Sequence, residues 1–227
     1  MSKFECWVVT ILQKIGYCLF FILYKIFVRI EIIGKENLIN LEGPVILAPN
    51  HTSELDTPAI PLVLPFFSPL FPICFAMVPI KKYKTFGWRS YFYGSGFLTL
   101  LGGYSVFSGY KDYAVSLKDH INLLKQGYTL CIFPEGKRTQ DGLFNPAHGG
   151  LGYLVYVSEA TVIPIAINTF FNISWLDFLK KSRKVRIKIG KPIRANELIP
   201  TELKNPEADD FRHISQIVLN RSKEIMN

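Results

Sequence analysis

The chain has 227 residues, 49% of them hydrophobic, which is enough for one sizeable core and a short appendage. Lys and Arg number 26 against 18 Asp and Glu, and the formal charge of +8 favours an anionic partner such as a phosphorylated substrate, an acidic membrane surface or nucleic acid. Only 19% of the residues are charged while 14% are aromatic, and no nucleic-acid-binding motif is recognisable, so the composition favours a membrane surface over nucleic acid.

Residues 7–29 form an apolar segment that is interrupted by Gln13, Lys14 and Lys25. Its longest uncharged piece, residues 15–24, is shorter than the roughly 20 residues that a membrane-spanning helix needs. No small-residue cleavage site follows, as a secretory signal would require. We therefore expect a helix that lies in one leaflet with its lysines reaching the head groups. The alternative is an ordinary helix packed on the core.

A second apolar block runs from Thr57 to Ile80 without a charged residue but with six prolines. Because proline breaks helices, the block cannot form a single regular helix. We expect a broken helix that leads into a strand near residues 74–78. The piece "FFSPLF" at residues 66–71 is either exposed to lipid or an acyl chain, or buried in the core, and the sequence leaves both readings open.

The rest of the chain alternates β-forming apolar runs with helical patterns, which is typical of an α/β domain. Residues 112–126 form an amphipathic helical pattern that ends at Gly127, and residues 148–160 form another. We expect one domain, residues 31–227, with a mixed central sheet flanked by helices, preceded by a membrane-associated helical segment, residues 1–30. The predicted strands are Val45–Ala48, Tyr104–Phe107, Tyr128–Phe133, Val162–Ile167 and Val185–Ile189.

The stretch "NHTSELDT" places His51 and Asp56 directly after the apolar run of residues 44–49, where a strand is expected to end. Because Thr52 or Ser53 can cap a following helix, the two side chains can meet near its first turn. A carboxylate on one ring nitrogen fixes the tautomer of a histidine and leaves the other nitrogen to take a proton, which contributes about 10²–10⁴-fold in rate. Taken alone, such a pair is more often a loop histidine near a surface carboxylate.

A second polar stretch, "FPEGKRT" at residues 133–139, also follows an apolar strand. Polar turns at the strand ends of an α/β sheet are where a ligand binds. Arg138 offers a fixed fork of donors for phosphate and Lys137 a second positive charge. Glu135 either binds a substrate hydroxyl or holds Arg138 in place.

Metal ligands and redox pairs are not recognisable in the sequence. The four cysteines are far apart and form no C-x-x-C pair, so neither a zinc site nor a disulfide framework is expected. No third ligand is spaced beside His51 and Asp56. We interpret the cysteines as reduced core residues in a cytosolic environment.

In their order and spacing, the two polar stretches resemble signatures of the glycerolipid acyltransferase family that includes the lysophosphatidic acid acyltransferases. The first signature, N-H-x-x-x-x-D, is matched by Asn50, His51 and Asp56. The third signature, F-P-E-G-T-R-S, is matched at five of seven positions: Phe133, Pro134, Glu135, Gly136 and Arg138. Further along the chain come a strand similar to V-P-V at residues 163–165 and a G-x-P-I-like ending at residues 190–193. The resemblance therefore covers roughly residues 30–195.

The resemblance implies transfer of a fatty acyl group from the thioester of acyl-coenzyme A or acyl carrier protein to the free hydroxyl of a lysophospholipid. The acceptor it implies first is 1-acyl-glycerol-3-phosphate, which would give phosphatidic acid. His51, oriented by Asp56, would act as the base. Glu135, Gly136, Lys137 and Arg138 would hold the glycerol-phosphate part. The resemblance implies no metal or other cofactor, and a location on the cytoplasmic face of a membrane.

The second signature departs from the family pattern. The family carries an arginine after a glycine and a short strand, whereas "GGYSVFSG" at residues 102–109 puts Ser108 or Gly109 there. If that arginine grips the phosphate of the acceptor, either Lys111 or Lys137 replaces it here or the acceptor is another lysolipid. The alternatives from other classes are a catalytically silent lipid-binding protein of the same fold and a thioesterase.

The basic run of residues 180–194 contains eight lysines and arginines. Within it, the alternation "VRIKI" puts Arg186 and Lys188 on one face of a strand. This face either meets an anionic membrane surface or is a solvated edge whose cations deter aggregation. The sequence is compatible with both.

Overall fold

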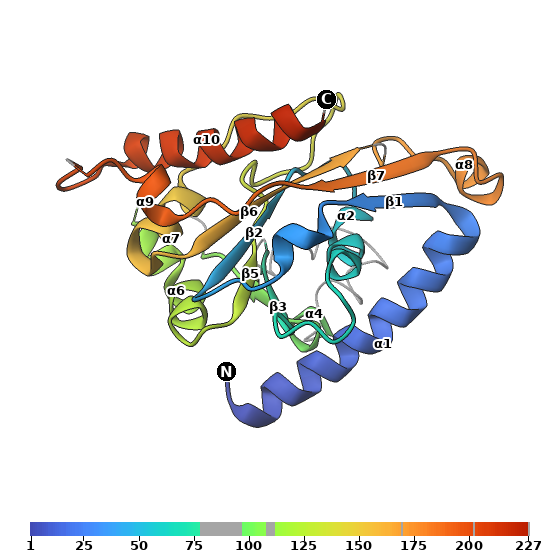
Figure 1. Cartoon of the computed structure of the whole chain (residues 1–227), viewed down its shortest axis with the longest axis horizontal. Coiled ribbons are helices and arrows are strands. Elements are labelled where there is room, and N and C mark those ends of the chain that lie inside the picture. Colours follow the sequence, from blue (N-terminus) through green and yellow to red (C-terminus); the bar gives the residue numbers. More distant parts are fainter. Residues whose placement is uncertain (78–96, 108–111, 169, 202, 227) are drawn as a thin grey trace.

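The computed structural model describes residues 1–77, 97–107, 112–168, 170–201 and 203–226 (Figure 1). In these residues a seven-stranded sheet forms the centre, in the order β1-β7-β6-β2-β5-β3-β4. Strands β6 and β7 are antiparallel and all other neighbours are parallel, so the sheet is mixed, as the sequence predicts. The strands are β1 (Arg29–Ile33), β2 (Val45–Pro49), β3 (Ile73–Met77), β4 (Gly103–Ser105), β5 (Thr129–Cys131), β6 (Thr161–Asn168) and β7 (Lys184–Ile189).

Helices cover both faces of the sheet, and Figure 1 shows α1 and α10 on opposite sides of it. Helix α1 and the short turns α2 and η2 pack on one face, while α6, α7 and α10 pack on the other. The α-helices are α1 (Lys3–Phe27), α2 (Asp56–Ala59), α4 (Phe97–Leu100), α5 (Tyr113–Ser116), α6 (Lys118–Lys125), α7 (Gly150–Ser158), α8 (Trp175–Leu179), α9 (Ala195–Leu198) and α10 (Ala208–Met226); the 3₁₀ turns are η1 (Lys35–Leu38) and η2 (Ile60–Val63).

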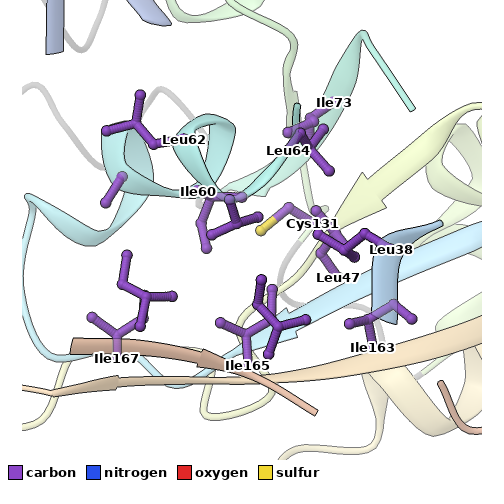
Figure 2. Close-up of a cluster of buried hydrophobic side chains, with 14 of the residues drawn as sticks. Leu38, Leu47, Ile60, Leu62, Leu64, Ile73, Cys131, Ile163, Ile165 and Ile167 are labelled. Carbon is purple, nitrogen blue, oxygen red and sulfur yellow. The ribbon is translucent and has the colours of Figure 1, made fainter. Parts of the chain in front are cut away.

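Two apolar layers form because successive side chains of a strand point to opposite faces of the sheet. In β2, Ile46 and Ala48 pack with α6, α7 and α10, whereas Val45 and Leu47 pack with α1 and η2. Figure 2 shows the second of these layers, in which alternate isoleucines of β6 face the η2 turn. The buried members that Figure 2 labels are Leu38, Leu47, Ile60, Leu62, Leu64, Ile73, Cys131, Ile163, Ile165 and Ile167.

Helix α1 is continuous for 25 residues, through both lysines and the glutamine that interrupt its apolar sequence. Its start is fixed by a capping box, in which Ser2 accepts from the Glu5 N–H and Glu5 accepts from the Ser2 N–H. By length and composition the helix is able to cross a membrane. Its outer face fits association with a membrane, because it exposes a row of large apolar side chains: Phe4, Trp7, Ile11, Ile15, Leu19, Ile22 and Ile26.

The inner face of α1 is anchored by a polar side chain. Gln13 is buried, and its amide donates to the Ile73 and Leu101 carbonyl oxygens at 2.6 and 2.9 Å and accepts from the Ile73 N–H at 2.9 Å. These bonds satisfy backbone groups at the start of β3 and the end of α4. The glutamine that looks like an interruption of the apolar sequence is therefore the point where α1 is bound to the sheet.

The proline-rich block forms α2 and η2 and then leads into β3, which confirms the predicted broken helix. Phe67 is exposed, whereas Phe66 and Phe71 are half-buried and lie against Tyr17 of α1. The predicted strand reached residue 78, which lies outside the described residues. The block is thus neither wholly exposed nor wholly buried.

Three other predictions need correction. The strand that carries Arg186 and Lys188, β7, is not an edge of the sheet, because it pairs with β1 on one side and with β6 on the other. The single helix expected at residues 112–126 is divided into α5 and α6 at Leu117, whose φ of −115° and ψ of 14° leave the helical region. Not all cysteines are core residues: Cys74 and Cys131 are buried, but Cys6 is half-buried and Cys18 is exposed because it lies on the outer side of α1.

Candidate active site

The two polar turns meet because β2 and β5, the strands that precede them, are parallel neighbours. Ile46 pairs with Leu130 and Leu47 with Cys131, so the carboxyl ends of both strands reach the same edge of the sheet. Asn50 fixes the first turn there, since its amide donates to the Ile167 carbonyl oxygen and accepts from the Ile167 N–H, at 3.0 and 2.6 Å. The two polar stretches therefore lie at the same edge of the sheet.

His51 and Asp56 are in direct contact. Nδ1 of His51 lies 3.0 Å from Oδ2 of Asp56, whose side chain has no exposed surface. Because a carboxylate accepts hydrogen bonds, this contact favours the tautomer of the neutral ring that carries its proton on Nδ1 and its lone pair on Nε2. The side chain of His51 is 18% exposed, and its ring stacks on Phe133 with 4.0 Å between centroids. The ring is thus held in one orientation and one tautomer.

Asp56 is itself held by the turn that it organises. Its carboxylate accepts from the N–H groups of Thr52 and Ser53, at 2.5 and 2.7 Å, and from the Thr52 hydroxyl at 3.0 Å. A buried carboxylate is costly without such donors. Residues 52–56 therefore wrap around the group that orients the histidine.

Glu135 ties the second turn to the first. It is buried, and its Oε1 accepts from the backbone N–H of His51 at 2.8 Å while Oε2 accepts from that of Asn145 at 2.7 Å. Burial raises the pKa of this carboxyl, and the two N–H donors partly offset the rise. The N–H of Thr139 returns to the His51 carbonyl oxygen at 2.9 Å, so the backbone of His51 is held on both sides.

Gly136 permits the tight turn after Glu135. Its φ of +63° lies in the left-handed region, and a Cβ there would approach the ring of His148 to 2.9 Å. Lys137 and Arg138 follow on the exposed side of the turn. Arg138 contacts Glu54 rather than Glu135: its NH1 nitrogen donates to Oε1 of Glu54 at 2.9 Å.

A cavity of about 490 Å³ opens beside these groups. Its polar lining includes His51, Glu54 and Arg138, which the contacts above bring together. Much of the remaining wall is apolar and comes from α1, α2, β3 and the segment around α4. Those residues are Leu12, Gly16, Tyr17, Phe20, Leu55, Pro58, Pro61, Phe75, Met77, Leu98, Leu101 and Gly103.

The site therefore combines a histidine whose Nε2 bonds to none of the described residues, an exposed arginine and an apolar cavity of the size of a ligand site. Such a set can move a proton and can bind a molecule with both an anionic and an apolar part. Among the described residues no group of three His, Cys, Asp or Glu side chains is arranged to hold a metal ion. Ser108, Gly109 and Lys111, which bear on the second signature, lie outside the described part of the chain.

The profile of the Acyltransferase family matches residues 29–168, which include both turns and the strands that carry them. This chain belongs to the acyltransferase family. Among solved structures, the fold of this acyltransferase is similar to that of the 1-acyl-sn-glycerophosphate (LPA) acyltransferase PlsC from Thermotoga maritima. The TM-score is 0.61 at 19% sequence identity, over 98% of this chain and 81% of that one.

Sequence reasoning missed two residues of the candidate site in this acyltransferase. Glu54 stands between His51 and Asp56 in the chain, but nothing local indicates its contact with Arg138, 84 positions later. Gln13 lines the cavity and binds β3. The sequence did carry a signal for a buried role of Gln13, because a single amide within an apolar helix must find a buried partner or face water.

Proposed function

We propose that the protein transfers a fatty acyl group from acyl-coenzyme A or acyl carrier protein to the free hydroxyl of a lysophospholipid. The acceptor that we propose is 1-acyl-glycerol-3-phosphate, with phosphatidic acid as the product. The observation that carries this proposal is the contact between His51 and Asp56 beside a cavity that is apolar along α1 and charged at Arg138. Acyl transfer to lysophosphatidic acid would use a base for its hydroxyl, an apolar site for its acyl chain and a cationic site for its phosphate.

In the proposed reaction, Nε2 of His51 takes the proton from the hydroxyl of the acceptor as its oxygen attacks the carbonyl carbon of the thioester. Asp56 stabilises the imidazolium that forms. A tetrahedral intermediate then collapses, the carbon–sulfur bond breaks, and the leaving sulfur takes the proton back from Nε2. The products are the new ester and the free thiol, and no proton is left over.

The second turn would bind the phosphate of the acceptor. Arg138 and Lys137 are exposed and carry the positive charge. Gly136 gives the turn its conformation, and Glu135 would contribute by fixing the turn, because both of its oxygens already accept backbone N–H groups. The acyl chain would lie along the apolar wall of the cavity, where burial of each methylene contributes about 0.8 kcal/mol.

We further propose that residues 1–30 attach residues 31–227 to the cytoplasmic face of an anionic membrane. The exposed apolar row of α1 supports this. In the basic run, Lys184 and Arg186 contact Glu31 at 2.8 and 3.1 Å, which compensates part of their charge. The exposed Lys180 would therefore contribute more per residue to binding of anionic lipid than these two.

The test is thioester consumption by the purified protein, with and without lysophosphatidic acid, for the wild type and for His51→Ala. We expect acceptor-dependent thiol release that falls by about 10²–10⁴-fold in His51→Ala. His213→Ala, at an exposed histidine of α10, is the matched control and should keep wild-type activity. Equal turnover in His51→Ala would refute the base assignment.

The same assay separates the alternatives. Free fatty acid released without acceptor would identify a thioesterase. Acyl transfer to other lysolipids but not to lysophosphatidic acid would identify a different acceptor. Vesicle binding without consumption of any thioester would identify a catalytically silent lipid-binding protein.

A further inference from the structure

The arginine expected to bind phosphate is already engaged. Arg138 donates to Glu54 at 2.9 Å, with 45% and 40% of the two side chains exposed. Both residues line the cavity together with His51. A ligand in the cavity therefore meets this ion pair.

Both partners come from turns that are held firmly. Glu54 lies within the turn that wraps around Asp56, and the next residue, Leu55, is fixed by a bond from the Tyr24 hydroxyl to its carbonyl oxygen at 2.9 Å. Arg138 precedes Thr139, whose N–H is bonded to the His51 carbonyl oxygen. The pair thus joins two ordered backbones, while its own side chains are exposed enough to rearrange.

A phosphate and a carboxylate compete for the same guanidinium donors. A guanidinium binds either group best through two parallel N–H bonds, and Glu54 occupies one of these donors. A phosphomonoester carries about −1.5 to −2 charges near neutral pH, so the carboxylate of Glu54 also repels it. An acceptor without phosphate would meet neither effect.

On the basis of the proposed function, we propose that Glu54 is a specificity-determining residue. Its carboxylate holds one donor of Arg138 and places a negative charge beside the guanidinium, so Glu54 weakens binding of a phosphomonoester and sets how strongly the site depends on head-group charge. An exposed ion pair of this kind corresponds to about a two- to five-fold effect on binding. If Glu54 instead orients Arg138 for the phosphate, removing its charge should weaken binding of the phosphomonoester.

The experiment compares the wild type with Glu54→Gln, which keeps the size of the side chain and removes its charge. Equilibrium binding of lysophosphatidic acid and its KM in acyl transfer are both measured, alongside binding of a monoacylglycerol with the same acyl chain. Glu224→Gln is the matched control, because Glu224 is an exposed partner of Arg221 on α10 at 2.8 Å. It removes the same charge away from the cavity.

We expect Glu54→Gln to lower the dissociation constant and the KM for lysophosphatidic acid by about two- to five-fold. The binding of monoacylglycerol and all values for Glu224→Gln should stay at wild-type levels. Weaker or unchanged binding of lysophosphatidic acid in Glu54→Gln would overturn the inference, and so would an equal gain for monoacylglycerol. If neither the wild type nor the two variants transfer acyl groups, the proposed function fails. The binding constants for lysophosphatidic acid and monoacylglycerol still decide the role of Glu54.

Discussion

Replacing Gly16 with leucine tests whether the cavity beside His51 holds the acyl chain. Gly16 lies in the middle of α1 and lines the cavity, and a Cβ added there meets no atom of the described residues within 4 Å. A larger side chain would therefore enter the cavity without a clash with the backbone. Because leucine is a better helix former than glycine, by up to about 1 kcal/mol, the helix should not be weakened.

The size of the effect follows from the lost burial. An isobutyl group has four carbons and fills roughly the room of four methylenes, each worth about 0.8 kcal/mol when buried. A donor whose chain reaches Gly16 would lose about 3.2 kcal/mol, which corresponds to roughly a 200-fold lower kcat/KM. A donor whose chain ends before Gly16 would lose nothing.

The assay measures kcat/KM for a series of saturated acyl-coenzyme A donors of increasing chain length, with one acceptor. Gly16→Leu should shift the preferred chain to shorter donors while the rate with short donors stays at the wild-type level. Ile15→Leu is the control, since Ile15 is the adjacent residue on the exposed face of α1. A uniform fall for every donor, or an unchanged preference, would refute the placement of the acyl chain in this cavity.

Two further predictions concern buried polar groups. Gln13→Leu leaves the backbone groups at the start of β3 without partners, which should lower the free energy of unfolding in urea by about 1–3 kcal/mol; an unchanged midpoint would show that apolar contacts alone hold α1. Burial lowers the pKa of His120 from its usual 6.5. The unfolded chain then binds a proton that the folded one excludes, so stability falls as pH drops below about 6.5. The urea midpoint should fall more between pH 7.5 and 5.5 in the wild type than in His120→Leu, and equal falls would contradict this.

The contact of the two turns was predictable because each of its signals is local. An apolar run followed by polar residues indicates a strand that ends at a loop, and this occurs before His51 and again before Glu135. Parallel pairing then brings the carboxyl ends of the strands to one edge, as the β2–β5 register shows. The contact between His51 and Asp56 follows from spacing within one turn.

The partners of Glu54, Gln13 and Glu135 were not predictable in the same way. Each contacts a group 60 or more positions away, and several of these groups are backbone atoms that any residue would supply. A single sequence does not indicate which of these distant groups a side chain will contact. The break at Leu117 is similar, because the apolar pattern continues through it and only the packing of α5 and α6 decides where the helix divides.

Burial divides the charged groups of the site into two kinds. Asp56 and Glu135 are buried and saturated with hydrogen bonds, so neither can turn toward a ligand without leaving backbone donors unpaired. Together they hold the ring and the backbone of His51, which in the proposed reaction would place Nε2 before the substrate arrives. Glu54 and Arg138 are exposed and can exchange partners at little cost. The chemistry is therefore expected to depend on the buried pair of carboxylates, and the choice of acceptor on the exposed ion pair.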